Sequence, residues 1–389
     1  KFYSVLPSSG VGDFDFTRSG GATRINSQGL IETVADGVSR LNYPLIDGKV
    51  VGCPSHLLEP QRLQKIQYSE DFSNAYWTKS GASVTSGFVS PKGDLSAFKL
   101  VEGTNTGVHY IYKTSVTVIA GKVTLSIRAK AGERNWIALR ETSSATGRYF
   151  DLTNGVLGGV YGSAPDESTI KPLANGWYDI SITVTAPSTT VSLFIYMIDV
   201  NGGVTYTGDG TSEIYIFGVQ VEEGSYPTSY IPNYGTSAGI TRSAETATGS
   251  GDASTFNSSE GVLMAEGALL DVSQNFNKIS ISDGSSAENR IEIIYLNDNE
   301  IKIELGLTNG FNEVLNVGSS ESFNKIAVVY NSTNASVFIN GFNLVTNTMS
   351  SLNGLSQLQF NRFNSNVENF HGSIKQLQYF DSALNDSDL

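Results

Sequence analysis

Residues 122–130 have the sequence KVTLSIRAK, in which apolar and polar side chains alternate at every position. This period of two predicts a β-strand with one buried face, because successive side chains of a strand point to opposite sides. Residues 178–185, YDISITVT, alternate in the same way. Further strands are expected at 108–112, 136–140, 191–197 and 213–221. Strands at this regular spacing, separated by Gly and Asn turns, predict a jelly-roll sandwich over residues 66–232.

The last third of the chain shows a second group of strands. Residues 300–305 and 325–330 are the clearest of them, with the sequences EIKIEL and KIAVVY. Between SVFI (336–339) and FNLV (342–345) stands Asn340-Gly341, the pair that type I′ β-hairpins prefer. We therefore expect another β-sandwich over residues 258–389.

The two remaining regions lack such patterns. Residues 233–257 are mostly Gly, Ser, Thr and Ala, a composition typical of a linker. Residues 1–65 are interrupted by prolines and contain too little apolar sequence for a core of their own. We expect them to form an extended attachment segment that packs on a neighbouring domain or another subunit and becomes ordered against that partner. The predicted fold class is all-β, with two β-sandwich (jelly-roll) domains in tandem behind an extended N-terminal segment.

Composition excludes several classes of partner. The 389 residues have a formal net charge of −13 and no basic stripe, so binding to nucleic-acid phosphates is not expected. No run of about 18 apolar residues occurs, so membrane insertion is not expected either. The single cysteine, Cys53, provides no disulfide framework and suggests assembly in a reducing cytoplasm. The chain starts at Lys1, which we interpret as a processed or truncated start.

Several short motifs resemble those of a known group of proteins. In the first 65 residues they are ATRIN (22–26), GLIE (29–32), RLNY (40–43) and LLEPQR (57–62). This series resembles a leader that recurs in phage structural and tail-associated proteins. Ser39 and Gln64-Lys65 depart from the usual pattern, which has proline and Asn-Leu nearby.

Two further resemblances cover the sandwiches. YSEDF (68–72), NGWY (175–178) and TSYIP (228–232) are similar to motifs of the carbohydrate-binding-module-like jelly rolls that follow that leader in phage proteins. VFING (337–341) and YFDSAL (379–384) look like the end of a laminin-G or concanavalin-A-like domain.

Together these resemblances imply a phage virion protein, in the tail, a fibre or a capsid decoration, that binds host or environmental polysaccharide. They imply assembly in the host cytoplasm, a place on the virion surface, other virion proteins as partners, and a homo-oligomer.

Sugar-binding sandwiches stack pyranose rings on exposed aromatic side chains and bind the hydroxyl groups with amide and carboxylate groups. The candidates on predicted strands of the jelly roll are Tyr110, Trp136, Tyr149, Tyr196 and Tyr206. In the last domain the candidates are Asn297, Asp298, Asn309 and Arg362. Each of these positions also fits an ordinary role, because aromatic residues pack on sheets and Asn and Asp shape turns.

Calcium is a candidate cofactor, because loops of such sandwiches can offer carboxylate oxygens. The resemblance points to Glu70 and Asp71 near the first strand and Glu222 near the last as ligands. His56, His109 and His371 are isolated, so a histidine metal site is not expected.

An enzyme is not expected. Residues 235–239, GTSAG, match the G-x-S-x-G nucleophile motif, but they lie in the predicted linker instead of between a strand and a helix. No repeat of 20 to 50 residues suggests a β-helix depolymerase. Three alternatives stay open: a decoration or cement protein without glycan affinity, a bacterial cell-surface or secreted lectin, and a polysaccharide-degrading tailspike.

Overall fold

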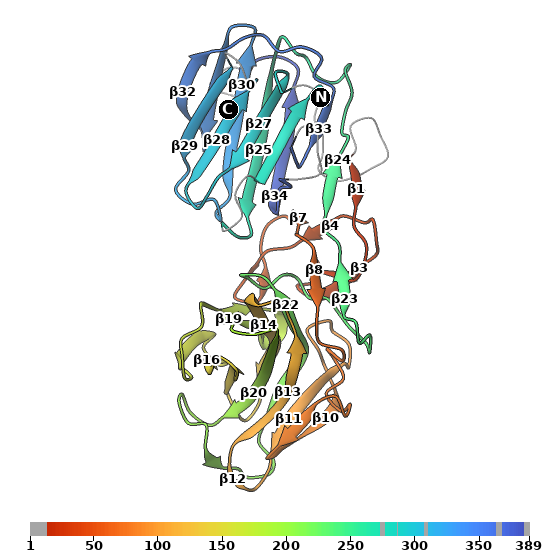
Figure 1. The fold of residues 1–389 in the computed structure, drawn as a ribbon, viewed down its shortest axis with the longest axis vertical. Coiled ribbons are helices and arrows are strands. Elements are labelled where there is room, and N and C mark those ends of the chain that lie inside the picture. Colours follow the sequence, from red (N-terminus) through yellow and green to blue (C-terminus); the bar gives the residue numbers. More distant parts are fainter. Residues whose placement is uncertain (1–13, 273–276, 286, 307–309, 363–367, 385–389) are drawn as a thin grey trace.

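The computed structural model describes residues 14–272, 277–285, 287–306, 310–362 and 368–384. Apart from one 3₁₀ turn, η1 (Ala174–Gly176), the regular structure in these ranges consists of β-strands. Two sandwiches lie at opposite ends of the long axis, with short strands between them (Figure 1). The predicted all-β class is confirmed.

The jelly roll contains two six-stranded antiparallel sheets. The first has the order β10-β11-β22-β14-β19-β18, with bounds Ala82–Phe88, Ala97–Glu102, Glu213–Glu223, Gly121–Ala131, Trp177–Ala186 and Glu167–Pro172. The second has the order β17-β16-β15-β20-β13-β9, with bounds Val156–Val160, Thr146–Asp151, Trp136–Glu141, Thr190–Ile198, His109–Thr117 and Thr78–Ser80. The strands predicted from the alternating patterns are confirmed.

The core of the jelly roll lies between its two sheets. Leu125 and Ile127 from β14 meet Ile137 and Leu139 from β15 there, and all four are fully buried. Because side chains alternate along β15, Trp136, Ala138 and Arg140 point to the other side of their sheet. This outer side of the second sheet is therefore free of the main core.

The C-terminal sandwich pairs a seven-stranded sheet with a five-stranded one. The larger sheet has the order β32-β31-β30-β25-β34-β7-β4, with bounds Phe342–Thr348, Asn334–Ile339, Asn324–Asn331, Glu260–Leu269, Gly372–Phe380, Ser55–Leu58 and Arg40–Asn42. The smaller has the order β29-β28-β27-β26-β33, with bounds Phe311–Asn316, Glu300–Leu305, Arg290–Tyr295, Asn277–Ser282 and Gln357–Gln359.

The predicted hairpin is also confirmed. Asn340 and Gly341 connect β31 to β32 with φ angles of 53° and 86°, the left-handed values that a type I′ turn requires.

Strands of the N-terminal segment pair with the C-terminal sandwich and with the region between the two sandwiches. Its strands β4 and β7 extend the larger C-terminal sheet, where Leu57 of β7 lies opposite Ser373 of β34. β1 (Asp15–Thr17) pairs with β24 (Thr246–Thr248), and β8 (Arg62–Gln64) pairs with β23 (Ile240–Arg242). Two hairpins, β2 (Ala22–Ile25) with β3 (Ile31–Val34) and β5 (Leu45–Ile46) with β6 (Lys49–Val50), complete it. The remaining described pair is β12 (Thr106–Gly107) with β21 (Tyr206–Thr207).

The region expected to be a linker, 233–257, thus contributes β23 and β24 to the junction. Its small residues form ladders through backbone groups, which do not require a hydrophobic pattern.

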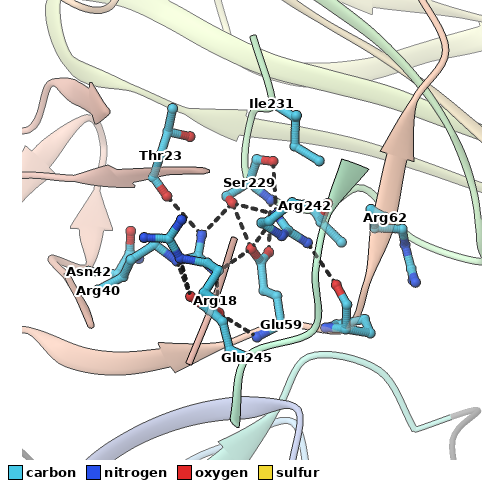
Figure 2. A network of polar contacts seen from close by, with 12 residues as sticks. Arg18, Thr23, Arg40, Asn42, Glu59, Arg62, Ser229, Ile231, Arg242 and Glu245 are labelled. Atoms are coloured by element: carbon cyan, nitrogen blue, oxygen red, sulfur yellow. Dashed lines mark hydrogen bonds and ion pairs between the residues drawn. The ribbon is translucent and has the colours of Figure 1, made fainter. Parts of the chain in front are cut away.

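A cluster of buried charges holds the junction together (Figure 2). Arg40 lies 2.8 Å from Glu59 and donates a 2.7 Å hydrogen bond to Glu245, and Arg242 lies 2.7 Å from Glu59. Arg18 lies 3.2 Å from Glu245. Of these five side chains only that of Glu59 keeps any exposure, at 3%. We call these five residues the junction cluster.

The junction cluster joins segments that are far apart in sequence. Arg40 and Glu245 are separated by 205 residues, and the backbone and hydroxyl of Ser229, which follows the last jelly-roll strand, both donate to Glu59. These contacts and the two arginines hold the pKa of Glu59 at about 2 despite its burial, so the carboxylate stays charged. The cluster therefore ties the N-terminal segment, the jelly roll and the β23–β24 region to one another.

Candidate functional site

An aromatic surface covers the outer side of the second jelly-roll sheet. Opposite residues of neighbouring strands place Tyr110 beside Tyr196, and Tyr196 beside Ala138. One row away, Tyr112 lies opposite Phe194. We name this surface the aromatic face and define it by Tyr110, Tyr112, Trp136, Tyr149, Tyr161, Phe194 and Tyr196.

Six of the seven rings of the aromatic face, all but that of Trp136, form one connected layer. Tyr112 stacks on Phe194 with ring centroids 4.6 Å apart and an angle of 9° between the planes. Tyr110 lies 5.0 Å from Tyr196, which in turn lies 5.3 Å from Tyr161. Tyr161 stacks on Tyr149 at 5.3 Å. Such contacts between rings hold the layer in a fixed arrangement.

The aromatic face is only partly covered. Tyr110, Tyr112, Trp136 and Phe194 are of intermediate exposure, whereas Tyr149 and Tyr196 are 5% and 6% exposed. Burial raises the pKa of both Tyr149 and Tyr196 above the ordinary value for tyrosine. These phenols are therefore uncharged at neutral pH. The solvent-facing part of the layer is formed by the partly exposed rings of Tyr110, Tyr112, Trp136 and Phe194.

The edge strand β17 borders the aromatic face and approaches it closely. A Cβ atom added at Gly158 would lie 2.6 Å from the Trp136 ring and 2.8 Å from the Cβ of Tyr149, so only glycine fits there. On the same strand Val156, Leu157 and Val160 are 50%, 38% and 40% exposed. The aromatic layer thus continues into an exposed apolar edge.

The structure brings together four of the five aromatic residues predicted for the jelly roll. Tyr110, Trp136, Tyr149 and Tyr196 belong to the aromatic face, whereas Tyr206 lies elsewhere. The Tyr206 hydroxyl donates to buried Glu102 over 2.9 Å, and its ring contacts that of His109 in a tilted arrangement, with centroids 4.5 Å apart.

Three residues of the aromatic face, Tyr112, Phe194 and Tyr161, are not among those predicted from the sequence. The first two stand two positions from Tyr110 and Tyr196 on the same strands, so the alternation could have identified them. Tyr161 follows β17 in a turn and carries no such signal.

The predicted polar residues of the last domain are not assembled into one site. Asn297 donates to Glu300 across the β27–β28 turn, and Asp298 accepts from the hydroxyl of Ser319. Arg362 follows β33, and in the sheet β26 lies between β33 and the β27–β28 hairpin. Asn309 lies outside the described residues.

The three carboxylates considered for calcium each have protein partners. Glu70 accepts from the Tyr230 hydroxyl and lies 3.3 Å from Lys92. Asp71 accepts from Ser73 in its own turn, and Glu222 accepts from the backbone and hydroxyl of Thr228. Within the described ranges no three His, Cys, Asp or Glu side chains converge as metal ligands. We therefore assign no calcium ligands, and calcium dependence stays a prediction.

Two cavities flank the N-terminal segment. One of about 690 Å³ lies between the β5–β6 turn and the loop around η1, with Asp47, Lys49, Asn154 and Asn175 among its lining residues. The other, of about 390 Å³, lies at the junction and is lined in part by Tyr43, Arg128 and Leu270.

Two further expectations concern catalysis and membranes. Ser237 of the GTSAG stretch lies in a turn ahead of the short strand β23, not on a strand-to-helix turn. The described part of the chain contains no helix of the length and hydropathy that a membrane span needs.

Comparisons with known proteins identify one part of the chain. Residues 268–389 match the family model of the Concanavalin A-like lectin/glucanases superfamily. No curated protein matches the sequence.

Among solved structures, the chain is similar to the CBM40 module of the Ruminococcus gnavus IT-sialidase bound to α2,3-sialyllactose. The identity is 17% over 36% of this chain and 91% of that one, with a TM-score of 0.30. A point mutant of the NanB sialidase from Streptococcus pneumoniae shows 14% identity over 35% of this chain and 24% of its own, with a TM-score of 0.30. Domain 4 of AbnA, a GH43 extracellular arabinanase from Geobacillus stearothermophilus, in complex with arabinotriose, shows 12% identity over 37% and 70%, with a TM-score of 0.29.

The family match and the two packed sheets together show that the C-terminal sandwich of this all-β chain is a concanavalin-A-like domain.

Proposed function

We propose that this protein binds glycans through the aromatic face of its jelly roll. The observation that carries the proposal is the layer of rings on a sheet side that the main core does not use. The apolar C–H face of a pyranose packs against such rings, and tyrosine hydroxyls can bind its hydroxyl groups. The match of residues 268–389 to a lectin-containing superfamily agrees with a glycan as ligand.

We further propose that the protein acts on the surface of a phage particle as an adhesin for host or environmental polysaccharide. The support is the resemblance of its leader and jelly-roll motifs to those of phage structural proteins. Many copies on one particle would turn weak single-site binding into firm attachment, because the effective concentration of the remaining sites rises after the first contact.

A glycan array with the full chain tests the binding proposal. We expect saturable binding, and we expect Tyr112→Ala to weaken it by about tenfold, which corresponds to about 1.4 kcal/mol. Tyr112 is the suitable target because it is only partly buried, so its removal leaves the core intact. Arrays run with and without EDTA would show whether binding also needs calcium.

The matched control for this experiment is Phe342→Ala. Phe342 is an aromatic residue on β32 of the other sandwich and is 72% exposed. Its replacement should leave glycan affinity unchanged. No binding of the unmodified protein at high micromolar concentration, or equal losses in both variants, would contradict the proposal.

A second function, as a decoration or cement protein, is favoured by one feature of the C-terminal sandwich. Strand β32 is a sheet edge, and its Phe342 and Leu344 are 72% and 46% exposed. Exposed apolar side chains on an open edge suit contact with another subunit. Sedimentation of the unmodified protein and of Phe342→Asp separates the cases, because only a contact through this edge would be lost in the variant.

A further inference from the structure

We infer that the glycan recognised by the aromatic face is acidic and that Arg140 binds its carboxylate. This inference rests on the proposed function and specifies the ligand class of the same site. Arg140 lies on β15 and points to the same side as Ala138, directly opposite Phe194 of the neighbouring strand.

The guanidinium of Arg140 is fixed above a ring of the aromatic face. It lies 4.3 Å from the centroid of Tyr161, which is close enough for a cation–π interaction. Its Nε is buried and has no hydrogen-bond partner, and no carboxylate lies within 4.0 Å of the group in the part of the chain that the structure describes. The positive charge is therefore held in place but not neutralised by the protein.

Several other arginines of the described chain, unlike Arg140, pair with a carboxylate. Arg134 forms a two-pronged pair with Glu102 at 2.8 and 2.6 Å, and Arg128 lies 2.9 Å from Asp179. In a protein with 38 acidic and 25 basic residues, a partner would be easy to supply.

The acidic residue next in sequence, Glu141, does not neutralise Arg140. Strand alternation sends Glu141 to the opposite side of the sheet. Its carboxylate accepts hydrogen bonds from the backbone of Ser143, Ser144 and Ser192 at 2.9, 2.6 and 2.9 Å. The Glu141 carboxylate is thus already hydrogen-bonded within the protein.

The position of Arg140 matches the size of one sugar. Opposite residues of neighbouring strands are about 5 Å apart, so a pyranose stacked on the partly exposed Phe194 could extend a ring carboxylate to the guanidinium. Arginine binds carboxylates through two parallel N–H groups, and the aromatic surroundings exclude water that would weaken the pair. Uronic acids and other carboxylate-bearing sugars fit this arrangement, whereas neutral sugars leave the charge unpaired.

The test uses an oligomer of hexuronic acids and the same oligomer with its carboxyl groups reduced to alcohols. We expect the full chain to bind the acidic form at least tenfold more tightly, and to lose this preference as salt is raised from 50 to 500 mM. Arg140→Gln should remove the preference while affinity for the reduced form stays unchanged. Arg140→Lys should keep part of it.

Arg148→Gln is the matched control. Arg148 lies on the neighbouring strand β16, opposite Leu139, and thus on the inner side of the same sheet; its Nε is also without a partner among the described residues. This variant should keep the full preference. Equal binding of both oligomers overturns the inference alone, as does a preference that survives in Arg140→Gln. If no glycan on the array, acidic or neutral, binds the protein, the proposed function is overturned and this inference with it.

Discussion

The aromatic face and the junction cluster use polar and charged groups in opposite ways. In the junction cluster each charge has an opposite charge within 3.2 Å, and further hydrogen bonds come from Ser229 and backbone carbonyls. On the aromatic face Arg140 contacts a ring and no carboxylate among the described residues, and the rings are only partly covered. Groups that the fold already satisfies serve stability, whereas groups that it holds in place without a partner are the ones to examine for ligands.

The largest effect is expected from Glu59→Ala in the junction cluster. Removing this carboxylate leaves Arg40 and Arg242 facing each other in a buried site, which should lower the free energy of unfolding by about 3–5 kcal/mol. Urea unfolding followed by tryptophan fluorescence reports on the jelly roll, because Trp77, Trp136 and Trp177 all lie in it.

Glu32→Ala is the control for Glu59→Ala. Glu32 pairs with Arg24 at 2.8 Å, but its side chain is 42% exposed, so the loss should stay within about 0.5 kcal/mol. If both variants unfolded at the same urea concentration, the junction cluster would have no special role in stability.

The second-largest expected effect is a loss of stability at low pH, caused by His56 on β7. Burial and the nearby Arg40 lower the pKa of His56 from 6.5 to about 4, and neither ring nitrogen has a hydrogen-bond partner among the described residues. The unfolded chain binds this proton more readily than the folded one between these two values. Stability is therefore complete above pH 6.5 and should fall by roughly 3 kcal/mol as the pH drops to 4.

His56→Leu should remove most of that dependence. Urea midpoints measured at pH 7 and pH 4 would differ less in the variant than in the unmodified protein. Glu59, whose pKa of about 2 lies below its ordinary value of 4.5, loses the same part of its contribution at pH 4 in both proteins, so it cancels from this comparison. An unchanged difference between the two midpoints would show that other groups, such as His371, govern acid sensitivity.

The strands of both sandwiches could be predicted because their signal is local. Alternation in 122–130 and the Asn340-Gly341 turn depend on neighbouring residues alone. The same alternation located Tyr110, Trp136, Tyr149 and Tyr196, since a strand places every second residue on one side.

The junction could not be predicted in this way. β7 is four residues long and pairs with a strand more than 300 residues later, and nothing in its sequence identifies that partner strand. Arg18, Arg40 and Arg242 resemble surface residues in the sequence, because burial of an arginine depends on a carboxylate brought near by the fold. Arg140 is likewise distinguished only by which groups surround it.

The smallest effects come from removing one hydroxyl at each of two predicted glycan-binding residues. Tyr206→Phe removes one of several hydrogen bonds that Glu102 accepts. This loss should lower the free energy of unfolding by about 1 kcal/mol and leave glycan affinity unchanged. Tyr110→Phe should do the reverse, because this partly exposed phenol belongs to the aromatic face: affinity should fall a few-fold while the urea midpoint is unchanged. Loss of affinity in Tyr206→Phe would place part of the binding site near Glu102, and the distinction between satisfied and available groups would then fail for this sheet.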